Sequence, residues 1–104
     1  MTRQPIACNL TGLNASQRKR QEELWRKLLG DVKSMRELPD GYEVSLPDTS
    51  ETILAAAEFI SLERICCSFL RFDLAVCREG EPVALRLTGG EGGKEFLKSA
   101  IARK

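Results

Sequence analysis

Two neighbouring segments of the chain alternate apolar and polar residues with the period of a β-strand. In residues 70–77 every second side chain is apolar, and Val83, Leu85 and Leu87 repeat the pattern after the turn-forming run 79–82. Because successive side chains of a strand point to opposite faces, each segment has one apolar and one polar face. The pattern predicts two antiparallel strands with helices on one face and solvent on the other.

Two helices are expected before these strands. The first is capped by Asn14 or Ser16 and ends near Leu29, and the second follows Asp48, which acts as its cap with Glu51 completing a capping box. Both have an apolar stripe at helical spacing. The stripe of the first helix is Leu24, Trp25, Leu28 and Leu29, and that of the second is Ala55, Phe59, Leu62 and Cys66.

The remaining segments complete an order that suggests a fold. Residues 5–10 predict a first strand, and residues 34–47 predict a hairpin whose turn ends at Gly41, which is expected to take a positive φ. A glycine-rich loop at residues 88–94 leads into a last helix. The order β-α-β-β-α-β-β-α predicts an α+β fold with a ferredoxin-like (split βαβ) antiparallel-rich sheet, plus an extra C-terminal strand and helix.

The length and composition of the chain exclude several classes of function. The 104 residues predict one domain, residues 1–104, and a net charge of +1 gives no field that would attract nucleic acid or a membrane. No apolar signal segment is visible near the N-terminus, so we expect a cytoplasmic protein, monomeric or homodimeric, whose cysteines are reduced thiols, metal ligands or core residues and not disulfides. The sequence contains no histidine, which excludes catalysis by histidine and zinc sites that use it.

The adjacent pair Cys66-Cys67 is the most unusual chemical feature of the sequence. Consecutive helical side chains point about 100° apart, but at a helix end the backbone can bring both sulfurs to one side. A soft ion such as Hg(II), Cu(I), Zn(II) or As(III) is then a feasible ligand. The structural alternative is that Cys66 fills the core beside Leu62 and Phe59, as buried free cysteines commonly do.

Two more residues are candidates for the same site. Cys8 is expected on the inward face of the first strand, which the ferredoxin-like order places beside residues 70–76, so it can supply a third sulfur. Glu63 lies three residues before Cys66, on the same side of the helix, as an oxygen ligand or base. The alternatives are a small core residue at Cys8 and a solvated carboxylate at Glu63. Cys77 is expected to be exposed and apart from the pair.

The segment Glu63-Arg64-Ile65-Cys66-Cys67-Ser68-Phe69-Leu70-Arg71-Phe72 resembles a group of small bacterial proteins and domains with an E-x-x-C-C-P-F-x-x-F signature. Members of that group tend to occur with MerR-type, heavy-metal-responsive regulators. The resemblance implies that Cys66, Cys67 and Cys8, with Glu63, form the functional group. Ser68 stands where the signature has proline, so the backbone after the pair need not keep the same shape.

Three hypotheses follow from these observations. The first is a domain that binds a soft metal ion or another thiol-reactive species, with no further cofactor. The second, ranked lower because no C-x-x-C is present, is a thiol redox or detoxification enzyme. The third is a structural or protein-interaction domain with core cysteines, in which the basic helix near Arg18 contacts a partner such as a regulator.

Overall fold

The computed structural model describes residues 12–102, which form three helices and four strands. The predicted first strand at residues 5–10, with Cys8, lies outside the described residues. No helix in the described range is long and apolar enough to cross a membrane. In chain order the elements are α1 (Ala15–Asp31), β1 (Ser34–Leu38), β2 (Gly41–Leu46), α2 (Ser50–Cys66), β3 (Arg71–Ala75), β4 (Val83–Thr88) and α3 (Gly90–Ala102).

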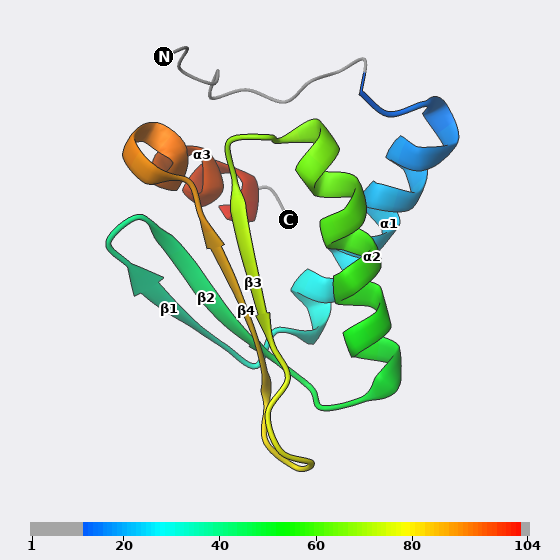
Figure 1. The fold of residues 1–104 in the computed structure, drawn as a ribbon, viewed down its shortest axis with the longest axis vertical. Helices are drawn as coiled ribbons and strands as arrows, with labels where there is room; N and C mark the ends of the chain where they lie inside the picture. The colour runs from blue at the N-terminus through cyan, green and yellow to red at the C-terminus, as the bar shows by residue number, and fades with distance from the viewer. Residues whose placement is uncertain (1–11, 103–104) are drawn as a thin grey trace.

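The four strands form one antiparallel sheet in the order β1-β2-β4-β3 (Figure 1). This confirms the α+β class and is compatible with the ferredoxin-like arrangement. In the ferredoxin-like fold the first strand lies between the two strands that come third and fourth in the chain, and these correspond here to β2 and β3. In this structure β4 occupies the position between them. The strand expected as a C-terminal addition therefore lies inside the sheet, and among the described strands β3 forms one edge.

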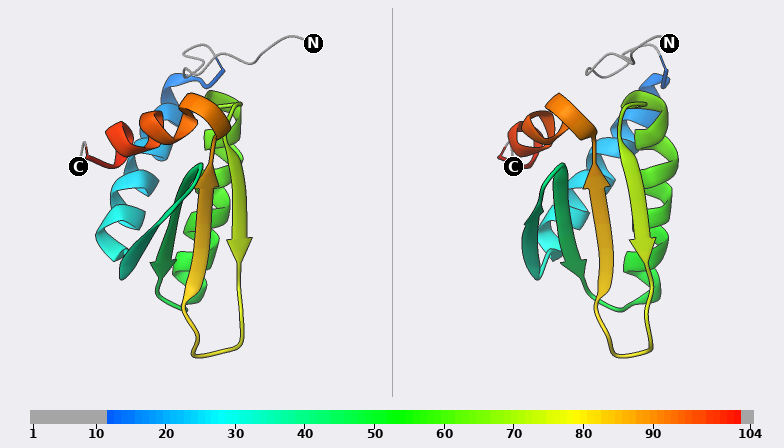
Figure 2. Two further views of the ribbon diagram at one scale, coloured as in Figure 1. Left: turned by 90° about the vertical axis from the view of Figure 1, so that its left-hand side faces the viewer. Right: turned by 60° about the vertical axis from the view of Figure 1, so that its left-hand side comes forward.

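All three helices cover the same face of the sheet. Figure 2 shows α1 and α2 side by side on this face and α3 crossing the end at which β4 finishes. The register places Tyr42, Leu87 and Phe72 in one row beneath the helices. On the opposite face Glu43 accepts a hydrogen bond from Arg86 at 2.6 Å. The predicted division into a buried apolar face and a polar solvent face is confirmed.

The hairpin turn forms as predicted, but Gly41 has another role. The described glycines with a positive φ are Gly80, Gly90 and Gly92, so the expectation for Gly41 is wrong. The β2 backbone instead approaches β4 so closely that a Cβ at Gly41 would lie 1.9 Å from the Leu87 carbonyl oxygen. A glycine is needed here for space between strands and not for an unusual dihedral angle.

The helix caps are partly as predicted. Asn14 caps α1 in a capping box, accepting from the Gln17 N–H at 2.8 Å and donating its own N–H to the Gln17 side chain at 2.9 Å. The cap predicted at Asp48 is wrong: Thr49 caps α2 by accepting from the Thr52 N–H at 3.1 Å. Asp48 instead accepts from the Gly80 N–H at 2.7 Å, which ties the start of α2 to the β3–β4 loop.

Side chains from α1 and α2 join the two helices. Trp25 stacks on Phe59 with ring centroids 5.3 Å apart, and the Arg20 guanidinium donates twice to the Glu58 carboxylate, at 2.8 Å each. The hydrogen bond from Arg20 lowers the pKa of the Glu58 carboxyl below its ordinary value. A carboxyl with a lowered folded-state pKa stabilises the fold above its unfolded pKa, and this contribution is lost as the pH falls through the folded pKa.

The Arg20–Glu58 pair predicts a specific change in acid stability. In Glu58→Gln we expect a slightly lower melting temperature at pH 7, because both side chains are about half exposed and solvent screens the pair. The difference should begin to shrink at about pH 4, the ordinary pKa of a free glutamate, and vanish below the lowered pKa of Glu58 in the folded protein. Melting curves between pH 7 and pH 3 measure this. A difference in melting temperature that stays the same from pH 7 to pH 3 would mean that the ion pair does not contribute to stability.

Candidate functional site

The end of α2 places its two adjacent cysteines in different surroundings. Cys66 is the last helical residue, whereas Cys67 is the C-cap, with φ −119° and ψ 74°, and its N–H donates to the Glu63 carbonyl at 2.6 Å. The Cys67 side chain is 0% exposed and belongs to the apolar core that includes Phe59 and Leu70. Cys66 is only partly buried. One sulfur therefore lies in the core and the other remains accessible.

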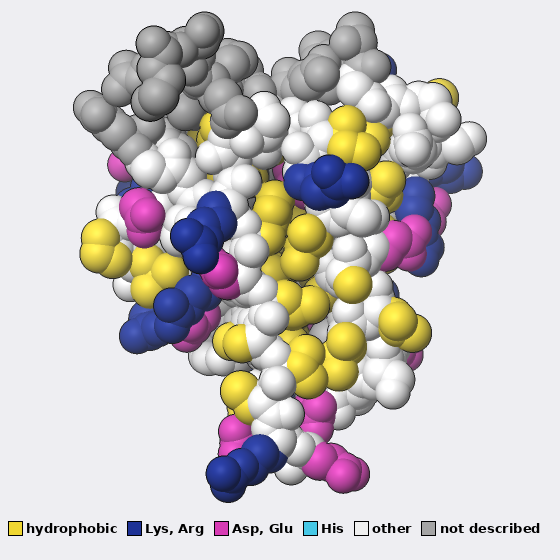
Figure 3. Space-filling model, viewed as in Figure 1, with side chains coloured by type: hydrophobic (Ala, Val, Ile, Leu, Met, Phe, Trp, Pro, Cys, Tyr) yellow, Lys and Arg dark blue, Asp and Glu magenta, His cyan; other side chains and the backbone are white. Residues whose placement is uncertain are grey.

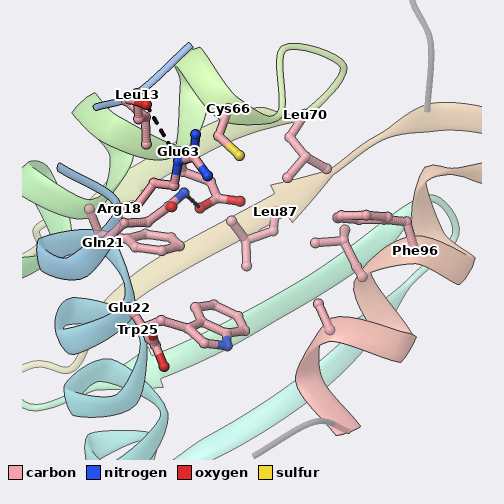
Figure 4. A pocket seen from close by; sticks show the side chains of 13 residues that line it. Leu13, Arg18, Gln21, Glu22, Trp25, Glu63, Cys66, Leu70, Leu87 and Phe96 are labelled. Carbon is pink, nitrogen blue, oxygen red and sulfur yellow. Dashed lines mark hydrogen bonds between the residues drawn. The ribbon is translucent and has the colours of Figure 1, made fainter. Parts of the chain in front are cut away.

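Cys66 lines a half-open cavity of about 560 Å³ that lies between all three helices and the inner face of the sheet. In Figure 4 its sulfur points into the space between Glu63, Leu70 and Leu87, with Phe96 of α3 on the far side. Most of the lining is apolar. It includes Trp25, Phe59, Leu70, Leu87, Phe96 and Leu97.

The polar groups of the cavity come from α1 and the last turns of α2. Gln21 Nε2 donates to Glu63 Oε2 at 2.5 Å, which fixes the carboxylate on the wall near Cys66 (Figure 4). Arg18 Nε donates to the Leu13 carbonyl at 3.4 Å at the N-terminal end of α1. A thiol, a guanidinium, an amide and the two carboxylates of Glu22 and Glu63 thus line one space whose other walls are apolar. Such a space can bind an apolar molecule and offers it a nucleophile at one point.

The predicted site residues are only partly brought together. Cys66 and Glu63 line the same cavity, while Cys67 turns into the core and Cys8 lies outside the described residues. Within residues 12–102 no group of three or more cysteine and acidic side chains is arranged to hold a metal ion. Cys77 is exposed and lines a shallow depression on the solvent face of the sheet with Arg71 and Asp73, apart from the pair as expected.

Two features of the site were not visible in the sequence. The apolar stripe of the last helix was recognised, but nothing indicated that Phe96 and Leu97 would wall the space beside Cys66. Gln21 lies in a run of charged residues and carried no signal for its hydrogen bond to Glu63, 42 residues away along the chain. Comparison of the chain with models of known protein families, with curated proteins and with solved structures finds no match.

Proposed function

We propose that the protein binds a soft metal ion or another thiol-reactive species through Cys66. The observation that carries the proposal is the position of the Cys66 sulfur on the wall of the cavity, near the carboxylate of Glu63. Thiolates prefer soft ions such as Hg(II), Cu(I), Zn(II) and As(III). The resemblance of residues 63–72 to proteins that occur with heavy-metal-responsive regulators supports the same ligand class, a cytoplasmic setting and a regulator as partner.

Glu63 is the second group of the proposed site. A thiol must lose its proton to bind a metal, and a nearby carboxylate can accept that proton or coordinate the ion as an oxygen ligand. The hydrogen bond from Gln21 holds the carboxylate in place for either role. Cys66 lies at the C-terminal end of α2, where the partial negative charge of the helix opposes a bare thiolate. A bound cation neutralises that charge, so binding and deprotonation favour each other.

Cys8 and Cys67 complete the proposal as further sulfur ligands. A two-coordinate soft ion needs a second sulfur, and Cys8, four residues before Gly12, can supply it from the segment preceding α1. Cys67 lies next to Cys66 in the chain but reaches the same ion only if its side chain leaves the core. We therefore rank Cys66 first, Glu63 and Cys8 next, and Cys67 last.

The proposal predicts that removal of one thiol abolishes binding. In an anaerobic titration of the reduced full-length chain with Hg(II), Cu(I) and Zn(II), followed by thiolate-to-metal absorbance, we expect stoichiometric binding that weakens at least about 100-fold in Cys66→Ser. The exposed Cys77 provides the matched control, because Cys77→Ser removes one thiol outside the cavity. Equal affinities for the two variants would contradict the proposal.

A protein-interaction domain is the second candidate, and one surface favours it. Figure 3 shows apolar side chains running down the middle of one face, along the boundary between β3 and α2. Leu54 of α2 is 69% exposed and Val76, just after β3, is 51% exposed. Among the described strands β3 pairs only with β4, so its other edge can accept a partner strand. Failure of the metal titration in the parent protein would shift the preference to this candidate.

A further inference from the structure

The cavity beside Cys66 suits an organic group better than a bare ion. An ion needs several donor atoms around it, but the walls opposite the thiol are the apolar side chains of Leu87, Phe96 and Leu97. These side chains offer no lone pairs to a metal. They offer instead a surface from which water is displaced favourably by an apolar molecule.

A second apolar space lies beside the first. A second cavity, of about 330 Å³, lies between α1, the sheet and the end of α3, and Trp25 and Leu87 line both cavities. Its other walls include Leu28, Val44 and Ile101, so this second cavity is apolar as well. The cavity at Cys66, of about 560 Å³, has room on its own for a ring that is bonded to the thiol and packs against Trp25.

We propose that the ligand of this site is a soft electrophile with an apolar organic group, such as an aryl-metal compound, which bonds to Cys66 and buries that group against Trp25, Leu87 and Phe96. This inference rests on the proposed function and names its ligand class. An organometal cation already has one bond to carbon, so a single thiolate can complete its coordination. The site then needs no cluster of protein ligands, in agreement with the separation of Cys66 from Cys67.

The bonding step balances without an oxidant or reductant. With an aryl-mercury salt, the Cys66 S–H gives its proton to Glu63 or water, the sulfur-mercury bond forms, and the mercury-anion bond breaks and releases the anion. The mercury-carbon bond is retained and no oxidation state changes. With a carbon electrophile such as a maleimide, the Cys66 S–H gives its proton to Glu63 or water, the sulfur bonds to one alkene carbon as the π bond breaks, and the other alkene carbon takes up a proton from the same acid.

The test compares reagents that differ only in their organic group, with Cys77 as an internal reference. Reduced full-length protein is treated with N-phenylmaleimide or N-methylmaleimide, and peptide mass spectrometry gives the rate at each cysteine. We expect the phenyl-to-methyl rate ratio at Cys66 to exceed that at the exposed Cys77 about tenfold or more, because Cys66 faces the cavity and Cys77 does not. Equal ratios at both cysteines would overturn the inference.

A cavity-filling variant locates the organic group. Ala100 lines the cavity from α3, so Ala100→Phe should lower the phenyl preference at Cys66 at least about threefold. The N-methylmaleimide rate in the same variant corrects for any change in access to the thiol. An unchanged preference would show that the organic group lies elsewhere and would also overturn the inference.

A parallel titration with phenylmercuric acetate and mercuric chloride tests whether the ligand is an organometal or a carbon electrophile. It also distinguishes failure of this inference from failure of the proposed function. Tighter binding of the phenylmercury ion supports the organometal class. A phenyl preference with maleimides alone assigns carbon electrophiles. Binding of both mercury compounds at Cys66 without any phenyl preference overturns the ligand class but leaves the proposed function standing. Binding of neither compound overturns both.

Discussion

Substitution of Gly41 by alanine is expected to lower the free energy of unfolding by about 3 kcal/mol. The new Cβ would lie 1.9 Å from the Leu87 carbonyl oxygen and 2.8 Å from the Thr88 Cα, both of which are backbone atoms of β4. A side chain can rotate away from a clash, but a strand backbone can move only by disturbing its ladder. Because β4 is central and pairs with both β2 and β3, that disturbance affects the whole sheet.

Urea denaturation followed by circular dichroism measures this loss, and Gly30→Ala is the matched control. Gly30 is exposed near the end of α1, and a Cβ added there has nothing within 4 Å. Alanine is favoured over glycine in a helix, so we expect Gly30→Ala to stabilise the fold by up to about 1 kcal/mol. If Gly41→Ala is as stable as the parent, β2 and β4 do not approach each other as closely as this structure requires.

Local patterns predicted most elements of the fold but not their arrangement. The alternation in residues 70–87 and the hairpin turn before Gly41 identify strands because they reflect the burial of one face, a property local to each segment. The same alternation fits a strand at any position in a sheet. Whether β4 lies at the edge or between β2 and β3 depends on pairing between distant segments, which no local pattern encodes. The role of Gly41 follows from that pairing and was missed for the same reason.

For the candidate site, the sequence predicted which residues share one face of α2 but not how each side chain is buried. The spacing of Glu63 and Cys66 correctly indicated that both lie on one side of α2, and both line the cavity. Which of the two sulfurs lies in the core and which faces the cavity depends on where the helix ends. Sequence patterns locate that end only to within one or two residues. Because α2 stops at Cys66, the backbone of Cys67 leaves the helical conformation and its side chain lies in the core. From the sequence, a core position was the alternative to a ligand role for Cys66, whereas the structure places Cys67 in the core.

This division of roles predicts opposite phenotypes for adjacent substitutions. Cys67→Ser should destabilise the protein by about 2 kcal/mol, because a smaller and more polar group replaces a side chain that is 0% exposed in the apolar core. Cys66→Ser should change stability by less than about 0.5 kcal/mol, since its side chain is partly exposed at the cavity wall. Urea denaturation of both variants measures the difference. Cys67→Ala is the control, which removes the sulfur without adding a polar atom and should cost about 1 kcal/mol.

Metal binding should separate the two variants in the reverse order. Under conditions where it remains folded, Cys67→Ser should bind Hg(II) within about threefold of the parent affinity, whereas Cys66→Ser loses binding. This outcome would mean that the accessible sulfur binds and the buried sulfur stabilises the end of α2. Loss of binding in both variants would mean that Cys67 leaves the core and shares the ion with Cys66. In that case the C-cap of α2 must rearrange on binding, and the cost of that rearrangement should reduce the gain in stability that Hg(II) gives the parent protein.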